Sequence, residues 1–188
     1  MTLATTGTYT LQDFIGDLDR ITREDVSGQR ITERAAPLLA RLVRDPSSLP
    51  ARYLTSPPGQ RGRYTLHRAP KFNVTSVVWR PGDRATAHNH ETWGVIGVID
   101  NEIEETRYRV TDSGAGRAKL EVTSVTRHRP GAVSCLVPGD EVHAMYNPTG
   151  RDTVEIHVYG KDLVGLKRRR WDDDGAEKLL VSDKYLNC

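Results

Sequence analysis

The sequence predicts an all-β barrel or sandwich preceded by a helical N-terminal segment. Three observations predict this fold class. Apolar residues recur at helical spacing between residues 10 and 45, and short runs rich in β-branched and aromatic residues follow from Tyr64 onward. Turn signals containing Gly, Pro or Asn separate each run from the next. Evenly spaced short strands with tight turns are typical of antiparallel barrels and sandwiches.

The helical segment comes first in the chain. Two groups of apolar residues recur there at helical spacing: Leu11, Phe14, Ile15 and Leu18, and then Ile31, Ala35, Leu38, Leu39, Leu42 and Val43. Pro37 lies in the second group and indicates a first helical turn or a kink. At 188 residues the chain fits one domain. We therefore expect a single domain, 1–188, in which a helical segment, 1–50, packs on a β-barrel, 60–188.

The β-rich part contains six runs that we expect to form strands: 73–80, 93–99, 102–110, 120–126, 132–137 and 153–159. Dipeptides such as Pro81-Gly82 and Pro138-Gly139 punctuate them. The strands are short and close together, so antiparallel pairing is expected.

Composition narrows the kinds of molecule that the protein is expected to bind. The formal net charge of +2 gives no support for binding to nucleic acid or to an anionic membrane. No run approaches the roughly 20 apolar residues of a membrane span. Residues 1–10 lack the basic and apolar regions of an export signal, and two cysteines make no disulfide framework. We expect a cytoplasmic protein that acts on a small molecule.

Three of the six histidines lie in two recognisable sequence motifs. Segment 82–90 reads G-x5-H-x-H and contains His88 and His90, while segment 138–147 reads P-x4-H-x3-N and contains His143. Residues i and i+2 of a strand point to one face, so His88 and His90 can chelate one ion. In a closed barrel, a distant strand is expected to bring His143 across the interior to complete the metal site.

The remaining histidines have simpler interpretations. An isolated histidine is most often a satisfied or exposed polar residue. We expect His67 to be a packing residue, or to lie behind the metal ligands, and His128, between Arg127 and Arg129, to be exposed.

The two motif segments resemble the two conserved motifs of the cupin superfamily, whose fold is a double-stranded β-helix, or jelly-roll barrel. Most metal-binding cupins place a glutamate ligand four or five residues after the second histidine. Here those positions are Gly94 and Val95, and Glu91 is expected to point away from the site. A ligand set of histidines alone is similar to that of the thiol dioxygenases, the family of cysteine dioxygenase and 3-mercaptopropionate dioxygenase.

A second segment also resembles that family. Residues 155–160 are similar to the strand that carries its Ser-His-Tyr relay, with His157 and Tyr159 matching and Glu155 standing in place of the serine. Period two puts these three side chains on one face of a strand. The alternative is an ordinary alternating strand with one solvent-exposed polar face.

The resemblance implies a non-haem Fe(II) enzyme that uses O2 as co-substrate and converts a thiol to a sulfinate. His157 and Tyr159 would be catalytic, with Tyr159 orienting the substrate. Neutral imidazole itself suits iron, zinc, copper and nickel alike. Mammalian members crosslink their active-site tyrosine to a cysteine, but residues 92–95 contain none, so we expect Tyr159 to be unmodified.

The substrate is expected to carry a carboxylate held by arginine. Arg63 falls where the cysteine enzymes have their carboxylate-binding arginine, with Arg61 as the alternative register. Arg168 falls where the 3-mercaptopropionate enzymes have theirs, although it also belongs to the charge run 167–174, which could lie in solvent. Cysteine is the first candidate substrate, and 3-mercaptopropionate and mercaptosuccinate are the alternatives.

Two other functions fit the same motifs. One is a different cupin reaction, such as an isomerase or an oxygenase of a carbon substrate with another metal. The other is a cupin that binds a small ligand without catalysis, which would have no need of His157 and Tyr159.

Overall fold

The computed structural model describes residues 8–188. Its N-terminal part contains helix α1 (Leu11–Glu24) and helix α2 (Gly28–Leu42), followed by two short 3-10 helices, Pro46–Ser48 and Ala51–Tyr53. The side chain of Thr10 caps α1 and is part of a capping box with Asp13. Pro37 lies well inside α2, so it does not mark a first turn.

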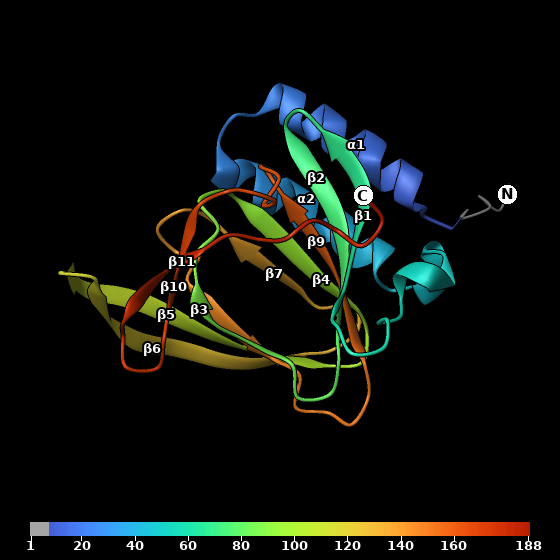
Figure 1. Ribbon diagram of the computed structural model, residues 1–188. Coiled ribbons are helices and arrows are strands. Elements are labelled where there is room, and N and C mark those ends of the chain that lie inside the picture. The colour runs from blue at the N-terminus through green and yellow to red at the C-terminus, as the bar shows by residue number, and fades with distance from the viewer. Residues whose placement is uncertain (1–7) are drawn as a thin grey trace, which may run out of the picture.

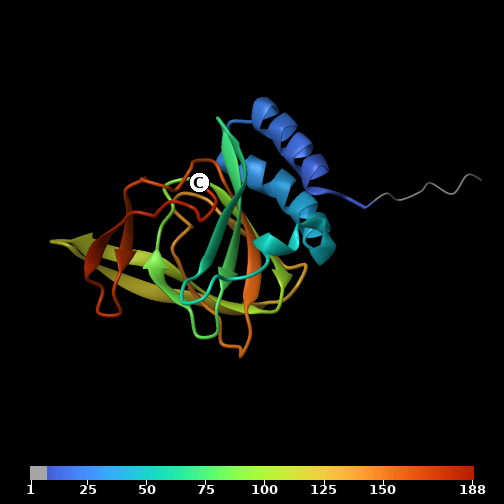
Figure 2. The ribbon, with the colours of Figure 1, turned by 45° about the vertical axis from the view of Figure 1, so that its right-hand side comes forward.

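The rest of the chain forms two antiparallel sheets that face each other (Figures 1 and 2). The five-stranded sheet has the order β1 (Gly62–Ala69), β2 (Phe72–Trp79), β9 (Thr153–Tyr159), β4 (Gly94–Asp100) and β7 (Val133–Leu136). The six-stranded sheet has the order β11 (Glu177–Leu180), β10 (Arg168–Trp171), β3 (Arg84–His88), β8 (His143–Tyr146), β5 (Ile103–Gly114) and β6 (Arg117–His128). Successive strands repeatedly change sheet, which makes a jelly roll.

Each of the six expected runs forms a strand, within a few residues of its expected ends. No strand was expected at β10, which reads Arg-Arg-Arg-Trp and lies within the charge run. Pairing with β3 and β11 makes it a strand, because tertiary contacts rather than an apolar alternation stabilise it.

The main core lies between the helices and the outer face of the five-stranded sheet, the face against which α1 and α2 lie in Figure 1. Val154, Ile156 and Val158 of β9 contribute one side of it, and Leu39 of α2 packs from the other. A Cβ atom at Gly97 would lie 3.0 Å from Leu39 Cγ, so glycine at this position allows α2 to approach the sheet closely. The opposite face of β9 is left to line the interior between the sheets.

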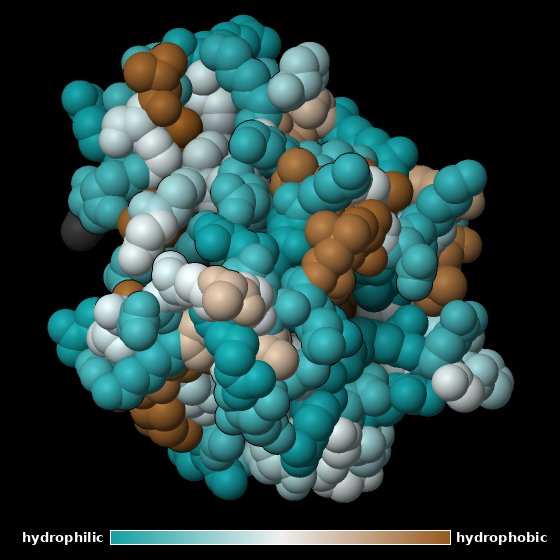
Figure 3. Space-filling view, turned by 60° about the vertical axis from the view of Figure 1, so that its left-hand side comes forward, coloured by the Kyte–Doolittle hydropathy of each residue, from teal (hydrophilic) through white to brown (hydrophobic). Residues whose placement is uncertain are grey.

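The surface is largely polar. Figure 3 shows one face that is mostly hydrophilic, with hydrophobic residues in separate small patches. The large apolar side chains that are most exposed include Val122 and Val125 of β6 and Leu179 of β11. Within residues 8–188, no helix has both the length and the hydropathy required to cross a membrane.

Candidate metal centre

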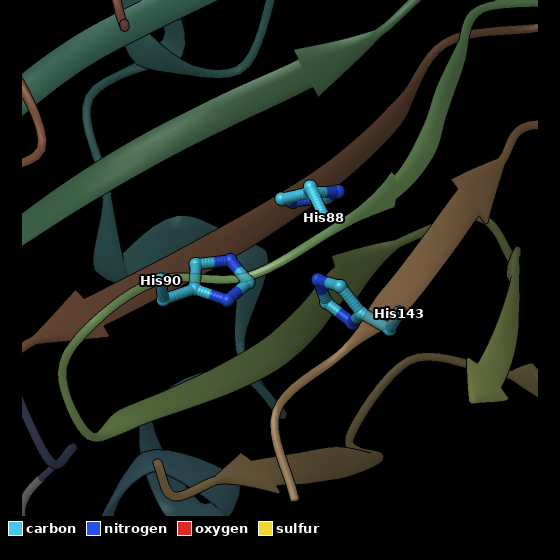
Figure 4. A group of neighbouring side chains, drawn as sticks. All are labelled: His88, His90 and His143. Atoms are coloured by element: carbon cyan, nitrogen blue, oxygen red, sulfur yellow. The ribbon is translucent and has the colours of Figure 1, made fainter. Parts of the chain in front are cut away.

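His88, His90 and His143 converge inside the jelly roll. Their ligand atoms lie within 4.8 Å of one another, and their rings are turned toward a common space (Figure 4). The ring centroids are 4.8 Å apart for His88 with His90, 4.8 Å for His88 with His143 and 5.0 Å for His90 with His143. Three imidazoles this close make a group that could hold one metal ion.

The way these histidines come together differs from the sequence-based expectation. His88 is the last residue of β3, whereas His90 lies beyond the end of the strand. His143 does not reach across the interior, because β8 is the hydrogen-bonded neighbour of β3 and His88 and His143 are register partners. Adjacent strands therefore bring two of the ligands together, and the chain turning after β3 supplies the third.

The loop that carries His90 is held by β10. The backbone N–H of Asn89 donates to Arg169 O at 3.0 Å, and the Asn89 side-chain oxygen accepts from the Arg169 N–H at 2.8 Å. Glu91 follows with a positive φ of 56°, and its exposed carboxylate lies 3.6 Å from the Arg169 guanidinium. As predicted, Glu91 points away from the three histidines.

The hydrogen bonds of the rings are compatible with metal binding. Nδ1 of His88 lies 2.8 Å from Thr86 O, and Nδ1 of His143 lies 2.7 Å from Glu105 Oε1. Both acceptors require a proton on Nδ1, which leaves each Nε2 with a free lone pair for a metal. Nδ1 of His90 is buried and has no hydrogen-bond partner among the described residues.

Burial also favours the form of histidine that binds metal. Desolvation, followed by the proximity of the other rings, holds the pKa of His88 and of His90 well below the ordinary histidine value. Neutral imidazole is the ligand form, and no proton has to be displaced from it. The donor set therefore fits a divalent transition metal, without selecting one.

Glu105 is a residue that the sequence motifs did not reveal. It is 3 % exposed, and its carboxylate accepts hydrogen bonds from His143, from His128 Nε2 at 2.8 Å and from Ser134 Oγ at 2.9 Å. Burial alone would raise the pKa of Glu105, but these histidines and Arg107 hold it well below its usual range. The expectation that His128 is exposed is wrong, because its ring is part of this hydrogen-bonded group.

Glu155, His157 and Tyr159 share the inner face of β9, as period two predicts. The Tyr159 hydroxyl lies 2.9 Å from His157 Nδ1, and His157 Nε2 lies 3.1 Å from Glu155 Oε2. The Tyr159 ring stacks on His90, with centroids 5.1 Å apart and planes at 17°. A Cβ atom at Gly94 would lie 2.7 Å from the Tyr159 ring, so only glycine leaves room for this stacking.

A cavity of about 440 Å³ opens beside the histidines and is lined by His88, His90, His157, Tyr159, Arg63 and Arg168, among others. Arg168 is 4 % exposed and therefore does not belong to a solvated charge run. It donates to Asn89 O at 3.1 Å and to Ser182 Oγ at 2.6 Å, while its Nε is buried without a partner in the described chain. Burial lowers its pKa.

Four further arginines line the same cavity: Arg61, Arg63, Arg84 and Arg170. Arg63 is half-buried, donates to Asp183 O at 3.3 Å, and lies 5.1 Å from the centroid of the Tyr185 ring. Arg61 lies over Trp79, 3.8 Å from the ring centroid, and pairs with Asp83 at 3.3 Å. Arg61 is thus engaged with a carboxylate of the protein, whereas Arg63 and Arg168 make no such ion pair within residues 8–188.

Two antiparallel sheets form a jelly roll, and histidines on β3, directly after β3 and on β8 meet between them. The fold is that of a cupin. No family model matches the sequence.

Solved structures with a similar fold include cupin-domain proteins. One is the cupin domain of an XRE-family transcriptional regulator from Enterobacter cloacae, with 18% sequence identity over 54% of this chain and 96% of that chain and a TM-score of 0.41. Another is a cupin superfamily protein from Desulfitobacterium hafniense, with 12% identity over 62% of this chain and 87% of that chain and a TM-score of 0.44.

An enzyme also appears among the similar structures. It is a DMSP lyase from Ruegeria pomeroyi, with 14% identity over 55% of this chain and 48% of that chain and a TM-score of 0.42. At such identities the likeness concerns the fold alone, and the reaction has to be argued from the site.

Proposed function

We propose that this cupin is a non-haem Fe(II) thiol dioxygenase. It would add both atoms of O2 to the sulfur of a small carboxylate-bearing thiol, converting R–SH and O2 to R–SO2H, with cysteine as the first candidate. One observation carries this proposal. The three-histidine group shares its cavity with Arg168, a buried guanidinium whose Nε has no partner in the described residues.

The composition of the histidine group favours an anionic sulfur ligand. His88, His90 and His143 are neutral donors, and the group contains no carboxylate. A divalent ion held by neutral ligands keeps its charge, and a coordinating thiol is readily deprotonated. Iron, when bound, would supply the redox chemistry that joins oxygen to sulfur. Iron itself is part of the proposal, since imidazole also suits other metals.

Arg168 would hold the substrate carboxylate. A guanidinium presents its N–H donors in a planar fork that matches a carboxylate, and such charge-assisted pairs are among the stronger hydrogen bonds. Because Arg168 is anchored through Asn89 and Ser182, its orientation is set before a ligand arrives. Asn89 also precedes His90 in the chain, so the anion site and the metal site share one support.

His157 and Tyr159 support an enzyme over a simple binding protein. They line the cavity and are hydrogen-bonded to each other, and Tyr159 also stacks on His90. Tyr159 would orient the substrate at the metal. A pocket that only binds a ligand has no need of such a buried tyrosine–histidine pair.

The second arginine favours a second candidate substrate. Arg63 and Arg168 line the same cavity, and neither is paired with a carboxylate within residues 8–188. Two such cations suit a thiol with two carboxylates, of which mercaptosuccinate is an example. The candidate 3-mercaptopropionate would use only one of them.

The cell compartment is proposed to be the cytoplasm.

The decisive experiment measures iron content and product formation together. The purified protein would be analysed for bound metals and then supplied with Fe(II) and cysteine, 3-mercaptopropionate or mercaptosuccinate, with O2 uptake and sulfinate followed side by side. We expect sulfinate in a one-to-one ratio to O2 for at least one thiol. The variant His67→Ala, outside the cavity, should retain the activity.

Two results would contradict the proposal. Metal binding without sulfinate from any of the three thiols would favour a different cupin reaction. If the purified protein held no metal and took none up, a non-enzymatic ligand-binding role would be favoured.

A further inference from the structure

Glu155 is a buried acid at the end of a chain of hydrogen bonds. Its side chain is 1 % exposed, and one of its oxygens, Oε2, has two neighbours. The indole Nε1–H of Trp79 donates to this oxygen at 2.7 Å, and His157 Nε2 lies 3.1 Å from it. On the other side of the imidazole ring, Nδ1 meets the Tyr159 hydroxyl at 2.9 Å.

For a neutral imidazole, these contacts determine where the protons lie. A carboxylate oxygen can only accept hydrogen bonds, so the proton between Glu155 and His157 belongs to His157 Nε2. A neutral imidazole with a proton on Nε2 has its lone pair on Nδ1. Nδ1 therefore accepts, and the Tyr159 hydroxyl must donate to it. The opposite tautomer would set two lone pairs against each other at 3.1 Å in a buried site, which is unfavourable.

We propose that Glu155 is a positioning residue that holds His157 in the Nε2–H tautomer, so that Tyr159 turns its proton away from the cavity and faces the ligand as a hydrogen-bond acceptor. The ligand group that meets Tyr159 must then be a donor, such as an ammonium N–H, or the S–H of a thiol before it loses its proton at the metal. The consequence for catalysis rests on the proposed thiol dioxygenase function, whereas the placement of the protons is independent of that function.

The identity of residue 155 matters for this role. A hydroxyl at this position could either donate or accept and would therefore permit both tautomers of the neighbouring histidine. A carboxylate permits one neutral tautomer. Trp79 reinforces the arrangement, because its single N–H donates to the same carboxylate oxygen and holds the side chain against His157.

Nitrogen NMR of the histidine rings tests the proposal without any reaction. The chelator-treated full-length protein, labelled with ¹⁵N-histidine, gives one pair of ring signals per histidine, and the variant His157→Gln identifies the pair that belongs to His157. We expect a protonated, pyrrole-type Nε2 and an unprotonated Nδ1 near neutral pH. A proton on Nδ1, whether alone or together with Nε2, would overturn the proposal.

Two variants of similar size then isolate the acceptor. Glu155→Gln keeps an oxygen that can accept from both Trp79 and His157, and should retain the Nε2–H tautomer. Glu155→Leu removes the acceptor, and the Nδ1–H form should become populated, with Tyr159 as its acceptor. If Glu155→Leu does not fold, the double variant Trp79→Phe, Glu155→Leu replaces it, since it leaves no indole donor without a partner. An unchanged tautomer in the folded leucine variant would contradict the proposal.

Kinetics separate this inference from the proposed function. For the best thiol substrate, kcat/KM should fall at least about tenfold in Glu155→Leu, and by a smaller factor in Glu155→Gln. Equal loss in both variants would contradict a role as acceptor. If the wild-type protein oxidises no thiol, the proposed function fails, while the ring signals still decide the role of Glu155.

Discussion

The two faces of strand β9 have opposite chemistry. The outer face carries Val154, Ile156 and Val158, which join the core beneath the helices. The inner face carries Glu155, His157 and Tyr159, which are linked to one another by hydrogen bonds. All seven residues of the strand are buried, so burial by itself does not distinguish the core of this protein from its site.

The two faces differ in what makes their burial favourable. Burying the apolar outer face stabilises the fold by about 25 cal/mol per Å² of apolar area removed from water. The inner face buries polar groups, which is tolerable because most of them have partners. Among the buried polar atoms of residues 8–188 that have no partner are Asn73 Oδ1, His90 Nδ1, Arg168 Nε and Trp171 Nε1. Substitutions on the outer side should therefore change stability, and substitutions on the inner side should change binding.

The largest effect is expected for a metal ligand on the inner side. His143→Ala removes one of three donors and should weaken metal binding by more than about hundredfold, since the loss of a mere supporting group already costs 10- to 100-fold. Competition with a chelator measures this change. The metal-free variant should unfold at nearly the same urea concentration as metal-free wild type, and a large loss of its stability would show that His143 also stabilises the fold.

The next effect belongs to the outer side. Leu39→Ala empties a fully buried position against the five-stranded sheet and should lower the free energy of unfolding by about 2–5 kcal/mol. Urea unfolding measures it. The neighbouring Leu38, which is only partly buried, should cost less when replaced by alanine. Metal affinity should be unchanged in both variants, and a change would show that the two faces are coupled.

A smaller effect is expected behind a metal ligand. Glu105→Gln keeps the shape of the side chain but removes the charge that orients His143, and should weaken metal binding by about 10- to 100-fold. Isothermal titration calorimetry of the metal-free protein tests this. Glu104→Gln, next to it on β5, is the matched control and should bind metal as wild type does.

Substrate binding should depend on Arg168 to a similar or smaller extent. Arg168→Met keeps the length of the side chain without its charge and should lower kcat/KM for carboxylated thiols by about thirtyfold, or about 2 kcal/mol. Arg169→Met changes the exposed arginine beside it and is the control. If the control loses as much activity as Arg168→Met, the carboxylate-binding role is wrong.

The smallest effect concerns pH. Burial alone would raise the pKa of Asp83, but hydrogen bonds from Arg80 and Arg61 hold it below its usual range. A lowered pKa in the folded state contributes stability that is present above the unfolded-state pKa and is lost as the pH falls through the folded-state pKa. Between about pH 6 and pH 3, Asp83→Asn should therefore lose less stability than wild type, by less than about 1 kcal/mol. Urea unfolding at both pH values measures this, and equal losses would contradict it.

Much of the site could be predicted from spacing in the sequence. The sequence motifs around His88, His90 and His143 identified the histidines that converge. The alternation of side chains along a strand placed His157 and Tyr159 on one face of β9. Such patterns are local, because strand geometry alone decides which side chains share a face. Glu91 was also expected to point away from the histidines, but it lies beyond the end of β3 with a positive φ, so strand alternation is not the reason.

Other features required the tertiary structure. Glu105 carries no motif, and it lies behind His143 only because β5 pairs with β8. His128 looked exposed between two arginines but reaches Glu105 from β6, across the β5–β6 pairing.

Local sequence patterns were enough to predict the two-part architecture, the three histidines and the polar face of β9, since hydrophobic period and strand alternation are properties of neighbouring residues. The strand pairing of His143 with His88 became apparent only in the folded chain, as did the position of the Arg168 side chain in the cavity. Strand order and burial depend on residues far apart in the chain. No local pattern of charge or polarity carries that information.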